Sequence, residues 1–127
     1  ITPTRQRVSA WPGCVPPEAI HMHPAHQNRR ALSATEIVTH LTQLNGDSAQ
    51  GWKLMEGALE KAFAFANFHE TMGFANAVAW IAHREDHHPE LVLAFGRCTV
   101  RFNTHDVAGI SLSDFHCAAA VDQLVKV

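Results

Sequence analysis

Two pairs of short apolar runs, each pair joined by a glycine-bearing turn, constrain the fold of this chain more than any other feature. The runs cover residues 52–55 and 59–65, then 91–95 and 98–103. Gly57 lies between the first two runs and Gly96 between the last two. Alternating apolar residues on both sides of such a turn predict a β-hairpin. The chain is therefore expected to contain four strands, arranged as two hairpins.

Three stretches with helical spacing of apolar residues lie before, between and after the hairpins. Their starts carry capping signals, at Ser33 with Glu36, at Asn67, and at Ser111 with Asp114. The first helix is expected to end at Asn45-Gly46 and the third at about Val125. The second is expected to end near Arg84 or Glu85, because Pro89 follows and disfavours helical geometry in the residue before it.

The order of these elements is helix, hairpin, helix, hairpin, helix. It predicts an α+β fold, with a four-stranded antiparallel sheet and three helices packed on one face. The second helix is expected to bury Phe68, Met72, Ala75, Ala79 and Ala82. The third helix is expected to bury Leu112, Phe115, Ala119 and Leu124.

Residues 1–30 are expected to form an extended or poorly ordered N-terminal arm, and residues 31–127 a single α+β domain. Five of the six prolines lie in the arm, which shows no sustained periodicity. Trp11 is expected to attach the arm to the domain. The arm also holds three histidines that are metal ligands on one interpretation and part of a solvated tail on another, namely His21, His23 and His26. The sequence starts at Ile1 rather than Met, so we expect it to be trimmed or partial.

Charge and cysteine content argue against several classes of protein. The formal net charge is −2 and the only basic doublet, Arg29-Arg30, is expected to be solvated, so we expect no nucleic-acid partner. No apolar run approaches the roughly 18 residues that a membrane span needs, so we expect no membrane partner. Cys14, Cys98 and Cys117 are widely spaced, which favours a reducing compartment over a disulfide framework. A cytoplasmic location, with the nucleus as an alternative, follows from these features.

Four of the ten histidines lie close together at the predicted end of the second helix and after the last strand. They are His83, His87, His88 and His105. Histidine can give and take a proton near neutral pH, because its unperturbed pKa is about 6.5. The cluster therefore indicates acid–base chemistry. Adjacent side chains diverge, so His87 and His88 can line one pocket only if the backbone turns sharply between them, and Pro89 favours such a turn.

The pattern around these histidines resembles the signature of the pterin-4a-carbinolamine dehydratase family. That signature has an acidic, basic or histidine residue, three variable positions and then His-His-Pro, which this chain matches with His83 and with His87-His88-Pro89. Thr104-His105-Asp106, followed by Gly109 and Asp114, matches the family's downstream motif, and Gly51-Trp52 its first strand. The resemblance covers roughly residues 32–124.

The resemblance implies a fold, an activity and a set of site residues. The implied reaction converts 4a-hydroxytetrahydrobiopterin to quinonoid dihydrobiopterin and water, without metal or other cofactor. His87 and His105 would protonate the departing hydroxyl, while His88 holds the pterin and assists proton removal. The implied substrate-binding residues are Trp52, His83, Asp86, Pro89, Thr104 and Asp106. The resemblance also implies a homodimer or homotetramer formed through helices and sheet edges.

Several alternatives stay open at the level of sequence. His83 and His87 are four residues apart on one helical face, and with His105 they could form a three-histidine metal site. A family member can instead serve as a dimerisation cofactor that binds a transcription regulator. Asp86 and Asp106 either orient a histidine or are plain helix-end and turn carboxylates. Trp52 either stacks on a flat heterocycle or belongs to the core.

Overall fold

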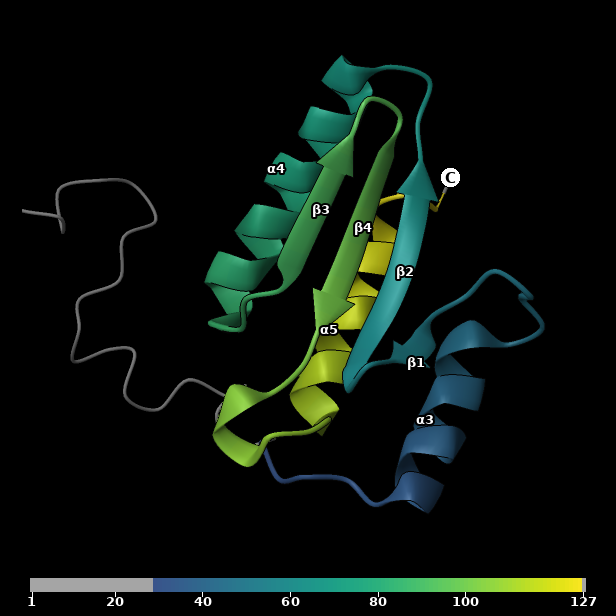
Figure 1. Cartoon of the computed structure of the whole chain (residues 1–127), viewed down its shortest axis with the longest axis vertical. Helices are drawn as coiled ribbons and strands as arrows, with labels where there is room; N and C mark the ends of the chain where they lie inside the picture. Colours follow the sequence, from purple (N-terminus) through teal and green to yellow (C-terminus); the bar gives the residue numbers. More distant parts are fainter. Residues whose placement is uncertain (1–28, 127) are drawn as a thin grey trace, which may run out of the picture.

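The structure, a computed structural model, describes residues 29–126, which form three α-helices and one four-stranded sheet in the predicted order (Figure 1). The elements are α3 (Ala34–Asn45), β1 (Lys53–Met55), β2 (Ala58–Ala64), α4 (Phe68–Glu85), β3 (Glu90–Ala94), β4 (Arg97–Phe102), the short 3-10 helix η2 (His105–Val107) and α5 (Leu112–Gln123). The predicted α+β fold class is thereby confirmed.

The two hairpins join through their longer strands into a sheet with the order β1-β2-β4-β3, antiparallel throughout. β4 therefore lies inside the sheet, paired with β2 on one side and with β3 on the other. Its side chains alternate as predicted: Cys98, Val100 and Phe102 are fully buried on the face that the helices cover. Figure 1 views the sheet from its open face, with α4 and α5 behind it.

Three capping residues start the helices as the sequence predicts. Ser33 and Glu36 form a capping box at α3, and the Asn67 side chain accepts from the backbone N–H of Glu70 at α4. Ser111 and Asp114 form a second capping box at α5. Each of these contacts joins residues three positions apart, so the starts of the helices can be predicted from the local sequence.

The buried face of α4 agrees only in part with the predicted one, which shares Ala75 and Ala82 with it. The buried residues are Thr71, Phe74, Ala75, Val78, Ile81 and Ala82, whereas Phe68 is 48% exposed and Ala79 is exposed. The polar Thr71 can be buried because its hydroxyl lies 2.9 Å from the carbonyl oxygens of Asn67 and Phe95, to which it can donate. This polar residue at the start of the buried face, in a helix with many alanines, hides from the sequence which face of α4 is buried.

The buried face of α5 was also only partly predicted. Phe115 is buried, but Leu112, Ala119 and Leu124 are exposed. The helix instead buries its capping residues together with Cys117, Ala118 and Val121. The polar residues at its start are buried because they hydrogen bond to one another, which a search for apolar spacing does not detect.

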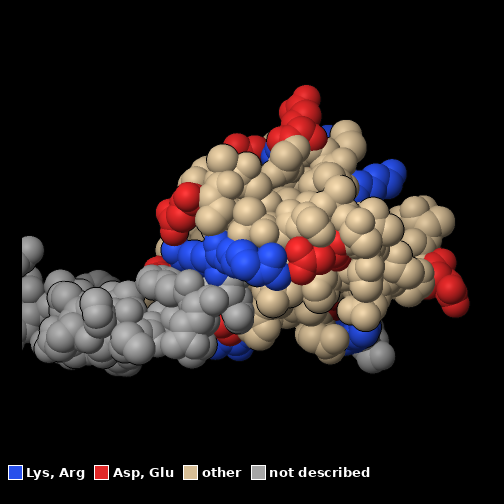
Figure 2. Space-filling model, turned by 90° about the horizontal axis from the view of Figure 1, so that it is seen from below, with Lys and Arg blue, Asp and Glu red and all other residues tan. Residues whose placement is uncertain are grey.

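Of the predicted N-terminal arm, only Arg29 and Arg30 belong to the described residues. Trp11 and the three histidines of the arm, His21, His23 and His26, lie outside them. Within residues 29–126, no helix combines the length and apolar character that crossing a bilayer requires. On the face shown in Figure 2, acidic and basic side chains are interspersed on a mostly uncharged surface.

Candidate active site

The C-terminal end of α4 turns the chain so that two neighbouring histidines reach one hollow. Asp86 caps the helix in the left-handed conformation, with φ 49° and ψ 46°. The N–H of His87 donates to the carbonyl of Ala82 at 3.0 Å, which closes the end of the helix. A sharp turn is therefore present at Asp86, before the histidine pair, whereas the turn expected from the sequence lay between His87 and His88.

His87 is held deep in the domain by a buried carboxylate at the start of α5. Its side chain is 5% exposed and its Nε2 lies 2.6 Å from Oδ1 of Asp114, which is itself fully buried. The His87 ring also stacks on the ring of Phe102, with an angle of 8° between the planes. Since Nε2 is engaged by Asp114, Nδ1 is the ring nitrogen of His87 that can act on a ligand.

The same carboxylate joins a second element of the site. Its Oδ2 accepts from the Thr104 hydroxyl at 2.7 Å and from the backbone N–H of Ser111 at 2.9 Å. The hydroxyls of Thr104 and Ser111 also lie 2.7 Å apart. Four residues thus share a buried hydrogen-bond network in which every member has a partner, and such networks fix the relative positions of the elements that they join.

His105 comes from the end of β4, on the other side of the hollow. After the strand, Thr104 pairs with Gly109 in an isolated bridge, and the loop between them includes η2. The bridge and the buried Thr104 hydroxyl hold the base of this loop, while His105 and Asp106 are exposed. His105 is therefore placed by its neighbours rather than by its own contacts.

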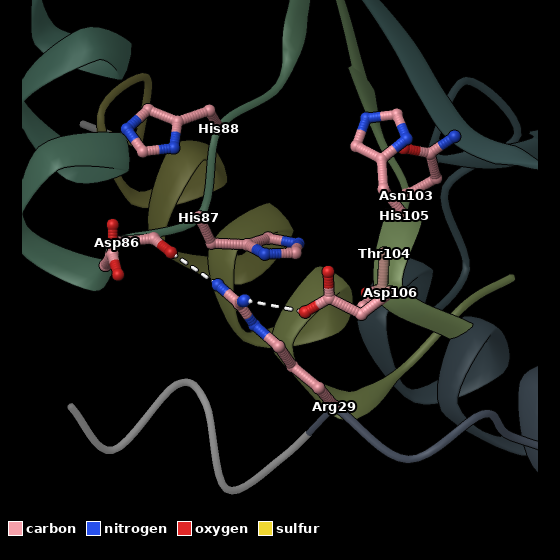
Figure 3. Close-up of a pocket in the computed structure, with 8 residues that line it drawn as sticks. All are labelled: Arg29, Asp86, His87, His88, Asn103, Thr104, His105 and Asp106. Atoms are coloured by element: carbon pink, nitrogen blue, oxygen red, sulfur yellow. Dashed lines mark hydrogen bonds and ion pairs between the residues drawn. The ribbon is translucent and has the colours of Figure 1, made fainter. Parts of the chain in front are cut away.

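A hollow of about 220 Å³ is lined by His87, His88 and His105. Its other lining residues are Arg29, Asp86, Asn103, Thr104 and Asp106. Figure 3 shows His88 and His105 on opposite sides of the hollow, with His87 between them. Within residues 29–126, neither the His88 ring nor the His105 ring makes a hydrogen bond, so both rings are available to a ligand.

A second hollow of about 330 Å³ adjoins the first and shares His88, Asn103 and His105 with it. Its remaining lining residues are Ala58, Pro89, Glu90 and Arg101. They come from the strands β2, β3 and β4 and from the loop after α4. The two hollows together offer a ligand several polar groups, with His88 and His105 at their boundary.

Two of the expected substrate-binding residues lie away from both hollows. Trp52 is 1% exposed, packs against Phe63 and Phe102, and donates its Nε1 hydrogen to Asp122 at 3.1 Å. It is thus a core residue in this structure. His83 is exposed on α4, where its ring lies 5.8 Å from that of Trp80.

The three-histidine metal site that the spacing suggested is not assembled. His83 does not line the hollow with His87 and His105, and Nε2 of His87 is bonded to Asp114. Within the described part of the chain, no group of three or more histidine, cysteine, aspartate or glutamate side chains is placed to hold a metal ion.

Three features of the site were not predicted from sequence. Asp114 was expected only as a helix start, yet its carboxylate lies 2.6 Å from Nε2 of His87. Asn103 lines both hollows. Arg29, expected to be solvated, has only 22% of its side chain exposed and contacts Asp86 and Asp106.

Cys117 lies in the core next to this site and carries no chemistry of its own. Burial raises the pKa of its thiol to about 12, and the nearby carboxylates of Glu85 and Asp114 act in the same direction. The thiol stays protonated at neutral pH, so it is a poor nucleophile.

Residues 30–124 match the sequence model of a family described as pterin 4 alpha carbinolamine dehydratase. A protein from Paracidovorax citrulli, named as a candidate pterin-4-alpha-carbinolamine dehydratase, is 54% identical, and the match covers 76% of this chain and 83% of that protein. A protein of the same name from Xanthomonas campestris pv. campestris is 43% identical, with 87% and 91% covered.

Two solved structures have a similar fold. One is described as a transcriptional coactivator/pterin dehydratase from Brucella melitensis; it has a TM-score of 0.69 and 27% identity over 76% of this chain and 100% of that one. The other is a pterin dehydratase-like protein identified as a RuBisCO assembly factor in the alpha-carboxysome. Its TM-score is 0.51 at 22% identity, over 60% of this chain and 90% of that one, so this likeness concerns the fold alone.

Proposed function

Because the chain belongs to the pterin 4 alpha carbinolamine dehydratase family, we propose that it dehydrates a 4a-hydroxytetrahydropterin such as 4a-hydroxytetrahydrobiopterin. The hydroxyl at C4a leaves with an added proton as water, and the adjacent N5 loses its proton. The product is the quinonoid dihydropterin. The observation that carries the proposal is the placement of His87, His88 and His105 around one hollow, with the rings of His88 and His105 free of hydrogen bonds among the described residues.

The reaction needs one group that gives a proton and one that takes a proton, because hydroxide is a poor leaving group. We assign His87 and His105 to protonating the departing hydroxyl. His87 can exchange its proton through Nδ1 while Nε2 stays on Asp114, so the ring keeps its orientation in both protonation states. His105 lies across the hollow and could reach a hydroxyl on the opposite face of the ring system.

His88 is assigned to holding the pterin and to removing the proton from N5. Its side chain is exposed and lies at the boundary between the two hollows. Asp86, Pro89, Thr104 and Asp106 also line one or other hollow. They remain candidates for substrate contact. The polar lining suits a heterocycle with hydrogen-bonding edges.

The test is the turnover of 4a-hydroxytetrahydrobiopterin by single histidine variants. Each positioned acid or base typically contributes about 100 to 10,000-fold, so His87→Ala and His105→Ala are expected to lose turnover by that order. His116→Ala is the matched control, because His116 is an exposed histidine on α5 that lines neither hollow. If the two site variants turn over substrate as fast as the control, the assignment is wrong.

A second role in protein binding is favoured by the outer face of α4. His69, Gly73, Asn76 and Trp80 recur there at steps of three and four residues, and all are exposed, Trp80 by 57%. Gly73 lets another helix approach closely, and Trp80 offers a large apolar contact. We propose that this face joins copies of the chain into a dimer or tetramer or binds a regulator.

The oligomeric role of this face is tested by Trp80→Glu. The added charge should lower the mass measured by light scattering, because a carboxylate at the contact would lose its water on association. Turnover per site should stay unchanged, since Trp80 lines neither hollow. An unchanged mass would contradict oligomerisation through this face.

A further inference from the structure

We propose that Arg29 is a positioning residue of this site, a role that rests on the proposed dehydration. Arg29 lies just before residues 30–124, which match the family model. Its Nη2 donates to the carbonyl oxygen of Asp86 at 2.6 Å, and its Nη1 donates to Oδ2 of Asp106 at 3.1 Å. Figure 3 shows the guanidinium between these two acceptors, at the edge of the hollow.

The two acceptors are the chain neighbours of two proposed catalytic histidines. Asp86 precedes His87 at the end of α4, and Asp106 follows His105 in η2. One planar group therefore joins the end of the helix to the loop after β4. Because a guanidinium has donors in a fixed fork, it holds two acceptors at a defined separation. This separation sets how far His105 lies from His87 and His88.

The guanidinium of Arg29 and the buried network around Asp114 hold different parts of the loop after β4. That network anchors Thr104, at the base of the loop, through Asp114. The tip of the loop, with His105 and Asp106, is exposed, and among the described residues its side-chain contact is the one with Arg29. Arg29 is therefore the group that can hold the tip in place. The guanidinium also lies against the carbonyl end of α4, where a cation is favourable.

The contacts of Arg29 suit a positioning role better than a stabilising one. Asp106 has 66% of its side chain exposed, and an ion pair with so exposed a partner adds little to stability. Moreover, Nε of Arg29 is buried and has no hydrogen-bond partner among the described residues, which offsets part of the gain from the other two donors. Loss of the side chain should therefore affect catalysis more than folding.

A surface ion pair without any catalytic role would have different properties. It would depend on charge alone, so lysine would replace arginine without loss. The link that Arg29 makes between Asp86 and Asp106 needs two donors held in one plane, which the single ammonium of lysine does not provide. Arg29→Lys therefore keeps the positive charge but removes this link. Arg30 gives a matched control, since it is the neighbouring arginine, is more exposed, and pairs with Glu36 away from the hollow.

The experiment compares Arg29→Ala, Arg29→Lys and Arg30→Ala with the unaltered protein. A misplacement of reacting groups by about 1 Å can cost roughly 100-fold, so Arg29→Ala is expected to lower kcat by about 10 to 100-fold. Arg29→Lys should lose nearly as much, and Arg30→Ala should lose nothing. The thermal midpoints of the three variants should agree closely. Millimolar guanidinium should restore part of the activity of Arg29→Ala and none of that of His105→Ala.

Two measurements separate this proposal from the proposed function. If the unaltered protein does not dehydrate the pterin, the function fails, and the role of Arg29 is then judged by NMR. The side-chain resonances of His87 and His105 should shift in Arg29→Ala and stay in place in Arg30→Ala. If the unaltered protein is active, full activity of Arg29→Lys or Arg29→Ala would overturn the role of Arg29. So would unmoved histidine resonances in Arg29→Ala.

Discussion

Nε2 of His87 lies 2.6 Å from Oδ1 of Asp114, and both side chains are almost completely shielded from solvent. The two residues are 27 positions apart and belong to different elements, the loop after α4 and the first turn of α5. Their contact gives the hollow a fixed wall, because a hydrogen-bonded buried imidazole has little freedom to rotate. Substitutions at this pair and around it therefore test both the stability of the fold and the chemistry proposed for the hollow.

Replacing Asp114 should damage both folding and turnover. The carboxylate accepts hydrogen bonds from His87, Thr104 and the backbone of Ser111. A buried hydrogen-bond donor left without its acceptor typically costs about 1–3 kcal/mol, so Asp114→Ala should lower the free energy of unfolding by at least that amount in urea titrations. Asp47→Ala, at an exposed position, is the control and should change it by less than about 0.5 kcal/mol. Equal stability of the two variants would contradict the structure.

The left-handed conformation of Asp86 predicts an unusual order of stability at that position. Glycine adopts this conformation without steric cost, whereas alanine does not. Asp86→Ala should therefore be less stable than Asp86→Gly by about 1 kcal/mol in chemical denaturation. The reverse order would show that the helix does not end with this turn. Turnover of the glycine variant then reports on the carboxylate alone, because the turn before His87 and His88 is preserved.

Trp52 should behave as a core residue rather than as a wall of the binding site. Trp52→Phe removes the hydrogen bond from Nε1 to Asp122 and is expected to cost about 1–3 kcal/mol of stability. The KM for the pterin should stay unchanged, because Trp52 lines neither hollow. A raised KM with unchanged stability would instead support the stacking role that the sequence suggested.

The capping box of α3 predicts a pH dependence at its glutamate. The Arg30 guanidinium and the Ser33 backbone N–H lower the pKa of Glu36 from 4.5 to about 2. A carboxylate with a lowered folded pKa stabilises the fold above its unfolded pKa, and this contribution is lost as the pH falls from about 4.5 towards about 2. The stability difference between the unaltered protein and Glu36→Gln should fade over that range. In Arg30→Ala, carbon NMR of the Glu36 carboxyl should show a higher pKa than in the unaltered protein.

Local signals in the sequence predicted the helices and strands. They also placed His87 after the end of α4 and His105 after the end of β4, where the structure has them. The caps at Ser33, Asn67 and Ser111 act over three or four residues, and the hairpins depend on adjacent turns, so these features are readable without a structure. The fold class, the family and the strand alternation of β4 were confirmed for the same reason.

Contacts between distant residues could not be predicted in this way. The burial of Thr71 depends on the carbonyl of Phe95, which lies 24 residues later, so the buried face of α4 was predicted only in part, at Ala75 and Ala82. The role of Asp114 depends on the packing of α5 against the loop after α4. Arg29 lies in a segment without periodicity, and nothing local distinguishes it from Arg30.

The two oxygens of Asp114 serve the start of α5 and the ring of His87 at once. A substitution at Asp114 therefore affects the start of α5 and the surroundings of His87 in one step, so neither can change without the other. Evolution of the proton transfer proposed for His87 would then have to proceed through other neighbours, such as Phe102, whose ring is stacked on the imidazole. The double use of one carboxylate restricts the paths by which this site can change.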